Sequence, residues 1–197
     1  MNTRRRAGVL VLLATLALGP AAQDAGAAAT AWNVDPTHSQ LTFHPRLAGG
    51  EFTGRFGRFE ATIRFDPTNL GQSSLLVVVD LLSARTGDSD RDVALQGSDF
   101  FQTTRWPQGT FNSTTIRSLG SGRYEATGKL TLRDVSRDVR VEFRFDPPAP
   151  SGGAARMTGS SSVHRLEFGV GQGDWRSTEW LDDAVRIDFD LALRAAH

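Results

Sequence analysis

Hydrophobic and polar residues alternate along much of this chain, which is the pattern of a β-strand with one buried face. In residues 137–145, valine and phenylalanine occupy every second position and charged or other polar residues lie between them. Residues 185–193 repeat the pattern with valine, isoleucine, phenylalanine and leucine. Because successive side chains on a strand point to opposite faces, both segments predict antiparallel strands that are buried on one face and solvated on the other.

A less regular form of the same pattern predicts further strands around residues 41–43, 59–65, 75–82, 124–132 and 157–163. Turns rich in Gly, Pro, Asp and Asn separate these segments. About eight strands at such spacing are typical of a β-sandwich or β-barrel. We find no internal repeat and no second domain, so the sequence predicts one antiparallel all-β domain.

One long segment, residues 86–111, interrupts the alternation and holds the only helix candidate. Asp88 or Ser89 can cap the first turn of a short helix, because side-chain oxygens of these residue types accept hydrogen bonds from free backbone N–H groups. The helix would run to about Gln96 and end at Gly97. We therefore predict a short helix in the 88–97 region.

Large aromatic residues follow this predicted helix and recur in a later loop. Phe100, Phe101 and Trp106 follow it directly, and Trp175 lies in a glycine-rich segment near the C-terminus. We predict that residues 86–111 form a lid or plug at one end of the barrel, with Phe100 and Phe101 pointing into the protein. The tryptophans would act as an apolar gate or, more simply, pack over the core as loop aromatics commonly do.

The N-terminus has the features of an export signal. Arg4, Arg5 and Arg6 precede an apolar stretch over residues 7–18, which small residues follow. This stretch is too short for a membrane span. We predict a secretory signal peptide over residues 1–31, with cleavage between 27 and 31, and a single domain over residues 32–197 in the periplasm or outside the cell.

Composition excludes several classes of protein. The sequence contains no cysteine, so disulfides, cysteine-ligated metals and a lipid-modified cysteine are excluded. Its 22 basic and 22 acidic residues balance. A nucleic-acid partner would require a basic surface, so none is expected.

Candidate catalytic and metal sites fail on geometry. Asp88, Asp90 and Asp92 resemble the spacing of a calcium loop, but Val93 stands where the tight turn needs glycine. Six residues of an intact strand would separate His38 from His44 by about 20 Å, too far to share one metal ion. We therefore assign no catalytic residue, no metal and no cofactor.

Short motifs occur along the chain in a fixed order: Asp35-x-x-His38-Ser39, Gly54-Arg55-Phe56, Thr86-Gly87, Arg91-Asp92, Leu95, Ser98-x-Phe100-Phe101, Pro107-x-x-Thr110-Phe111, Gly128-x-Leu130-Thr131-Leu132 and Val163-x-Arg165-x-x-Phe168-Gly169. Each motif is weak alone, but the ordered set resembles the YceI family of exported lipid-binding proteins. Residues 169–175 with 182–193 are similar to a branch of that family found beside membrane cytochromes of the b type.

The resemblance implies a lipocalin-like antiparallel β-barrel that encloses an isoprenoid or another long apolar chain, without catalysis. It also implies a membrane cytochrome of b type as a partner. An incomplete barrel would expose strand edges that could pair in a homodimer.

An eight-stranded barrel either fills its interior with side chains or leaves room for one ligand. The side chains expected to face the interior are almost all apolar: Phe43, Val77, Val79, Phe111, Leu130, Leu132, Val141, Phe143, Ile187 and Phe189. The favoured hypothesis is a carrier for a polyisoprenoid, an isoprenoid quinone or a fatty lipid. The alternatives are a lipid hydrolase or isomerase that uses His38 with Asp35, and an interaction module with a filled core that supports a membrane cytochrome or a stress response.

Overall fold

The computed structural model describes residues 28–196, so the predicted signal peptide lies outside the described residues up to residue 27. Its strands are β1 (Ala31–Val34), β2 (Gln40–His44), β3 (Arg46–Leu47), β4 (Gly50–Glu51), β5 (Gly54–Phe56), β6 (Phe59–Arg64), β7 (Ser74–Asp80), β8 (Ala84–Arg85), β9 (Gln108–Gly120), β10 (Arg123–Leu132), β11 (Val135–Asp146), β12 (Ala155–His164) and β13 (Ala184–Ala195). The α-helix α1 spans Ser89–Gln96.

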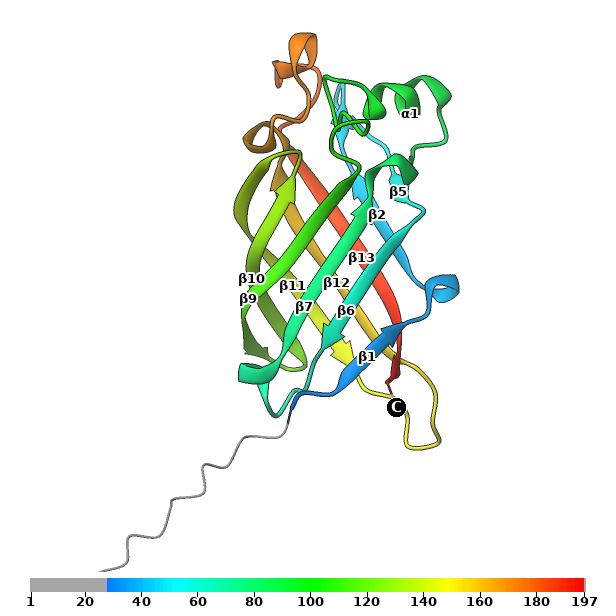
Figure 1. The fold of residues 1–197 in the computed structure, drawn as a ribbon, viewed down its shortest axis with the longest axis vertical. Coiled ribbons are helices and arrows are strands. Elements are labelled where there is room, and N and C mark those ends of the chain that lie inside the picture. Colours follow the sequence, from blue (N-terminus) through cyan, green and yellow to red (C-terminus); the bar gives the residue numbers. More distant parts are fainter. Residues whose placement is uncertain (1–27, 197) are drawn as a thin grey trace, which may run out of the picture.

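Eight antiparallel strands form a closed ring in the order β1, β6, β7, β9, β10, β11, β12 and β13. The ring closes because β1 pairs with β13, where Trp32 lies opposite Ala195. Figure 1 shows the resulting barrel, with α1 and the loop before β13 at its upper end and the C-terminus near its lower end. The predicted antiparallel all-β barrel with one short helix is confirmed.

Three of the barrel strands are broken into two pieces. The 3-10 turn η1 (Pro36–His38) separates β1 from β2, and both pieces pair with β13. A short break separates β5 from β6, and the 3-10 turn η3 (Leu81–Ser83) separates β7 from β8. The strands β2, β5 and β8 thus extend the wall toward the upper end.

The alternation predicted the faces of the strands. Along β11 the side chains at 139, 141, 143 and 145 are buried or half-buried, and those at 138, 140, 142 and 144 are exposed. The strand β9 was not among the predicted segments, because serine, threonine and asparagine occupy many of its positions and dilute the hydrophobic signal. It pairs with β7 and β10 and completes the wall.

The helix α1 begins and ends where the sequence indicated. The Asp88 carboxylate accepts hydrogen bonds from the backbone N–H groups of Asp90, at 3.1 Å, and Arg91, at 3.0 Å. Gly97 follows the last helical residue, and its N–H donates to Ala94 O. A side-chain cap at the first turn therefore fixes where the helix begins.

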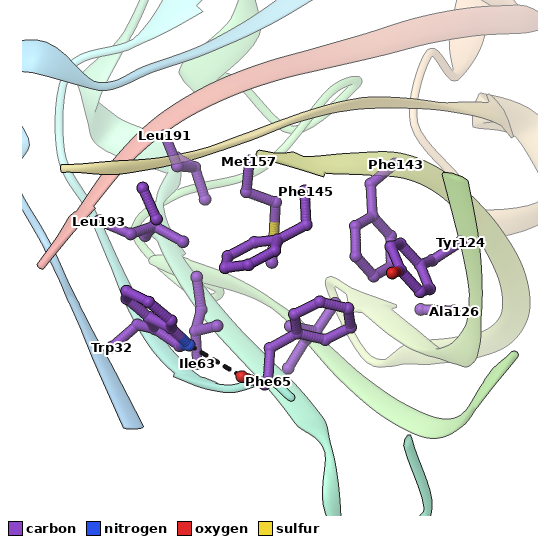
Figure 2. Close-up of a cluster of buried hydrophobic side chains, with 12 residues drawn as sticks. Trp32, Ile63, Phe65, Tyr124, Ala126, Phe143, Phe145, Met157, Leu191 and Leu193 are labelled. Atoms are coloured by element: carbon purple, nitrogen blue, oxygen red, sulfur yellow. Dashed lines mark hydrogen bonds between the residues drawn. The ribbon is translucent and has the colours of Figure 1, made fainter. Parts of the chain in front are cut away.

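The buried side chains form two separate clusters. The lower cluster contains Trp32, Ile63, Phe65, Leu75, Tyr124, Ala126, Phe143, Phe145, Ala155, Met157, Leu191 and Leu193. The upper cluster contains Phe43, Leu81, Ala84, Phe100, Phe101, Val163, Phe168, Val170 and Leu181. Figure 2 shows the lower cluster, in which the Trp32 indole N–H donates to Phe65 O at 2.9 Å.

Candidate ligand cavity

A cavity of about 280 Å³ lies inside the barrel and reaches into both clusters. The inward side chains around its middle are only half-buried, among them Val77, Phe111, Val141 and Phe189, although they face the interior. A filled core would bury such residues completely. The barrel is therefore packed at its two ends and hollow between them.

The predicted interior residues lie on this cavity with one exception. Its lining includes Phe43, Val77, Val79, Phe111, Leu130, Leu132, Val141, Ile187 and Phe189. Phe143 lies instead in the lower cluster, 3% exposed, where its ring stacks on Tyr124 at 5.4 Å between centroids. The expectation that Phe143 faces the cavity is thus corrected: it faces inward, but below the hollow.

The cavity lining is almost entirely apolar. Its polar side chains are Thr86, Arg91, Thr110, Ser161 and Arg165, and within residues 28–196 no carboxylate or histidine lines it. An apolar ligand in this space gains about 25 cal/mol for each Å² it removes from water. The arrangement can therefore bind a hydrocarbon chain without directional hydrogen bonds.

Aromatic side chains from two loops cover the upper end of the cavity. Phe100 and Phe101 are buried, 8% and 7% exposed, as predicted, and both line the cavity. Trp175 also lines it and contacts the Phe100 ring at 5.7 Å between centroids. Three of the four predicted lid residues therefore lie at the cavity.

The fourth predicted lid residue, Trp106, occupies a different place. Its ring lies beneath two guanidinium groups, those of Arg105 at 4.4 Å and Arg133 at 4.7 Å. Such cation–π contacts stabilise a loop without reaching the interior. Trp106 thus braces the segment that carries Phe100 and Phe101, and it is not among the residues that line the cavity.

Backbone hydrogen bonds join the two loops of the lid. The carbonyl of Asp99 accepts from Gly171 N at 2.6 Å and from Gln172 N at 2.8 Å. The Arg133 guanidinium donates to Phe100 O at 3.1 Å and also to Gly169 O. The segment after α1 and the loop that precedes β13 are therefore held together as one lid.

Arg165 organises the loop before β13 from within, and sequence reasoning assigned it no role. It is 4% exposed, and its guanidinium donates to backbone carbonyls of Val170, Gly171, Leu181 and Asp182. Burial lowers the pKa of this guanidinium, and the nearby carboxylates of Asp183 and Asp182 oppose that effect. Its acceptors come from residues up to 17 positions away, so no local motif indicated this function.

His38 and Asp35 form a contact that lies away from the cavity. His38 Nδ1 is 3.1 Å from Asp35 Oδ2, and the His38 side chain is 72% exposed on η1. Hydrogen bonds from Thr37 and from His38 lower the pKa of the Asp35 carboxyl well below its usual range. As expected, His38 bonds its sequence neighbours.

The acidic residues near α1 serve local structure. Asp88 caps the helix, and Asp92 Oδ1 accepts from Thr86 N at 2.7 Å and from Thr86 Oγ1 at 2.8 Å. Within the part of the chain that the structure describes, no group of three or more His, Cys, Asp or Glu side chains is placed to hold a metal ion.

Comparison with known protein families places this barrel. The family model described as a YceI-like domain matches residues 32–193, which include every strand of the barrel except the first residue of β1 and the last two of β13. The chain belongs to the YceI family. The family resemblance inferred from the ordered motifs is therefore confirmed.

Relatives of this YceI protein occur in several bacteria. A UPF0312 protein of Pseudomonas aeruginosa is 31% identical over 165 residues, which cover 80% of this chain and 86% of the relative. A UPF0312 protein of Vibrio parahaemolyticus is 30% identical over 146 residues, covering 73% of this chain and 77% of the relative.

Solved structures share the fold. BcnA of Burkholderia cenocepacia superposes with a TM-score of 0.76 at 31% identity, covering 81% of this YceI chain and 99% of BcnA. A polyisoprenoid binding domain from Saccharophagus degradans, implicated in plant cell wall breakdown, superposes with a TM-score of 0.64 at 17% identity, covering 85% and 99%. The second likeness establishes the shared fold alone.

None of the helices described in this YceI protein is long and apolar enough to cross a membrane.

Proposed function

We propose that this YceI protein is an exported binding and carrier protein for a long apolar ligand, namely a polyisoprenoid, an isoprenoid quinone or a fatty lipid. The observation that carries the proposal is the apolar cavity between two packed clusters, with inward side chains that are left half-exposed. The likeness to a polyisoprenoid binding domain supports the same ligand class.

Export is the second part of the proposal. It rests on the basic and apolar residues at the N-terminus. Within the expected cleavage window, Thr30 O accepts a hydrogen bond from Phe65 N at 2.8 Å, and Ala31 O accepts one from Ala196 N at 2.9 Å. Cleavage close to residue 27 would keep both bonds, so these contacts favour the start of the window.

The contacts of His38 weigh against a lipid hydrolase or isomerase. The imidazole lies on η1 and the Asp35 carboxylate caps that turn, and neither residue is among those that line the cavity. A general base must lie within hydrogen-bond reach of the proton that it removes. Replacing His38 by alanine is expected to leave ligand binding unchanged, and a loss of lipid turnover in that variant would instead favour the enzyme.

The remaining alternative is an interaction module with a filled core. The cavity weighs against it, because a hollow of about 280 Å³ without an occupant would forgo packing energy. A membrane cytochrome of b type as a partner rests on the resemblance of residues 169–175 and 182–193. A homodimer through strand edges remains a prediction. Because the ring of strands is closed, fewer unpaired backbone groups are left for such pairing.

The proposal is tested by extracting the purified protein with organic solvent and identifying co-purified lipids by mass spectrometry. Ala61→Phe places a ring into the space, because Ala61 lines the cavity, and it should reduce the recovered lipid severalfold. Thr62→Phe is the matched control, since Thr62 is the next residue on β6 and faces solvent. If the wild type carries no lipid and cannot be loaded with any, the carrier function is wrong.

A further inference from the structure

The wall of the barrel has a seam between β1/β2 and β5/β6. Below the seam, Trp32 pairs with Ile63, and above it Thr42 pairs with Arg55. Between these points lie residues 33–41 on one side and 56–62 on the other, and in this described region no strand pairing joins the two sides. The hydrogen-bonded wall is therefore interrupted here.

Each side of the seam is instead hydrogen-bonded to the segment that lies on its far side from the seam. On one side, Asp35 N donates to Ala192 O at 2.9 Å, and Ala192 N donates to Ser39 Oγ at 3.0 Å. On the other side, Gly57 N donates to Ser83 O at 3.1 Å. The two sides can consequently separate without breaking a backbone hydrogen bond across the seam.

A groove of about 970 Å³ runs along the outside of the seam, from η1 to the segment before β9. Its lining combines apolar residues, such as Pro36, Val78 and Leu82, with polar and charged residues: Ser39, Gln40, Thr42, Arg55, Arg58, Glu60, Asp80, Thr103 and Gln108. Leu82 is 44% exposed and lies in this groove.

Three side chains line both the cavity and the groove: Leu41, Phe56 and Phe59. Phe56 packs with the upper cluster and Phe59 with the lower cluster, so the seam lies at the height of the hollow between them. All three side chains are half-buried and separate the inside of the barrel from the groove.

The cavity and the groove lie on the two sides of the seam, so a connection between them would give a long ligand room on both sides.

We propose that the seam is a side portal: the apolar ligand enters and leaves past Leu41, Phe56 and Phe59, and part of a long chain lies in the outer groove. This inference rests on the proposed function. The ends of the barrel are less suited to passage, because the aromatic lower cluster fills one and the hydrogen-bonded lid covers the other.

The portal is tested by blocking the groove and measuring exchange rates. The sequence has no cysteine, so Glu60→Cys can be labelled selectively with a bulky maleimide. Glu142→Cys is the control, because Glu142 is an exposed residue on β11, opposite β6 in the ring. Stopped-flow fluorescence would follow uptake of cis-parinaric acid from vesicles and its release. We expect labelled Glu60→Cys to slow both steps about tenfold and labelled Glu142→Cys to slow neither.

An upper route would give the opposite result. At the upper rim the Arg91 guanidinium lies 4.5 Å from the centroid of the Phe52 ring, and both residues reach the cavity. If Phe52→Ala accelerates exchange and the labelled groove has no effect, the side portal is wrong. Phe59→Ala, in contrast, should accelerate exchange if the portal is correct.

Chain length tests the groove separately. Leu82→Asp places a charge in the groove and should weaken binding of a long-chain fatty acid severalfold while leaving a short-chain fatty acid unaffected. Leu76→Asp is the matched control, because Leu76 is also an exposed leucine but lies outside the groove lining. Equal effects of the two variants would overturn the groove assignment. If the wild type takes up no apolar probe at all, the proposed function fails and the portal fails with it.

Discussion

The two ends of the barrel are closed in different ways. Strand side chains close the lower end, where Phe65 is fully buried and contacts the rings of Tyr124, Phe143 and Phe145 at 4.9–5.4 Å. Loops close the upper end, and they are held by hydrogen bonds from Arg133, Arg165 and backbone amides to loop carbonyls.

This difference separates stability from access. Packing of the lower cluster is continuous with the strands, so it cannot open unless the barrel wall loosens. The upper lid is made of loops, and the side seam has no strand pairing across it among the described residues; such regions open at lower free energy than a packed core. We therefore expect substitutions at the lower end to affect global unfolding and those at the upper end to affect local opening and ligand binding.

The largest effect is expected from Phe65→Ala. Removing a fully buried ring from the lower cluster should lower the free energy of unfolding by about 3–5 kcal/mol, measured by chemical denaturation. Phe65→Leu is the conservative control and should lose much less. A change no larger than that of a surface substitution would show that the lower cluster does not carry the stability of the barrel.

A smaller and more local effect is expected from Arg165→Met. The variant leaves loop carbonyls without their donor, which should cost about 2 kcal/mol and speed hydrogen exchange in residues 166–183. Arg176→Met is the control, because Arg176 is exposed in the same loop. If hydrogen exchange becomes faster to the same extent across β10 and β11, the upper end does not open independently of the barrel wall.

Trp175→Ala should change ligand affinity more than stability. Trp175 lines the cavity, so its removal should weaken binding of an apolar ligand by about threefold to tenfold through lost apolar contact. Trp180→Ala, at a side chain that is 60% exposed, should leave affinity unchanged. Fluorescence titration measures the affinity of both variants. Equal losses of affinity would show that Trp175 makes no specific contact with the ligand.

The smallest effect concerns the cap of α1 and its dependence on pH. The hydrogen bond from Arg91 N is the main cause that lowers the pKa of Asp88. The cap therefore contributes stability above the ordinary carboxyl pKa of about 3.9 and loses it as the pH falls through the lower pKa of the folded state. Asp88→Asn should flatten this acid dependence in helix exchange rates, and an unchanged profile would contradict the assignment.

Much of the candidate site was predictable because strand alternation is a local property. Parity along β7 and β13 indicated the inward residues, and Val77, Ile187 and Phe189 indeed face the cavity. Phe143 shows the limit: parity gives the face of a strand but not the height in the barrel, which depends on how neighbouring strands are staggered.

Arg165 and the seam are features that the local pattern of hydrophobic and polar residues does not predict. The acceptors of Arg165 lie in a loop that folds back over it, and the sides of the seam are defined by strand pairings between residues more than ten positions apart. Trp106 is likewise a large loop aromatic, as expected of a gate residue. Its ring instead packs against the guanidinium of Arg133, a residue in the turn between β10 and β11.

The sequence by itself determined most of the long strands, the capped helix, the inward faces and the membership of the family, because each depends on the order and spacing of nearby residues. The tertiary structure alone decided that the barrel is hollow at its middle, that a buried arginine holds its lid and that its wall is interrupted between β1/β2 and β5/β6. Those features arise from the stagger and closure of strands that are distant in the chain, and no local pattern encodes them.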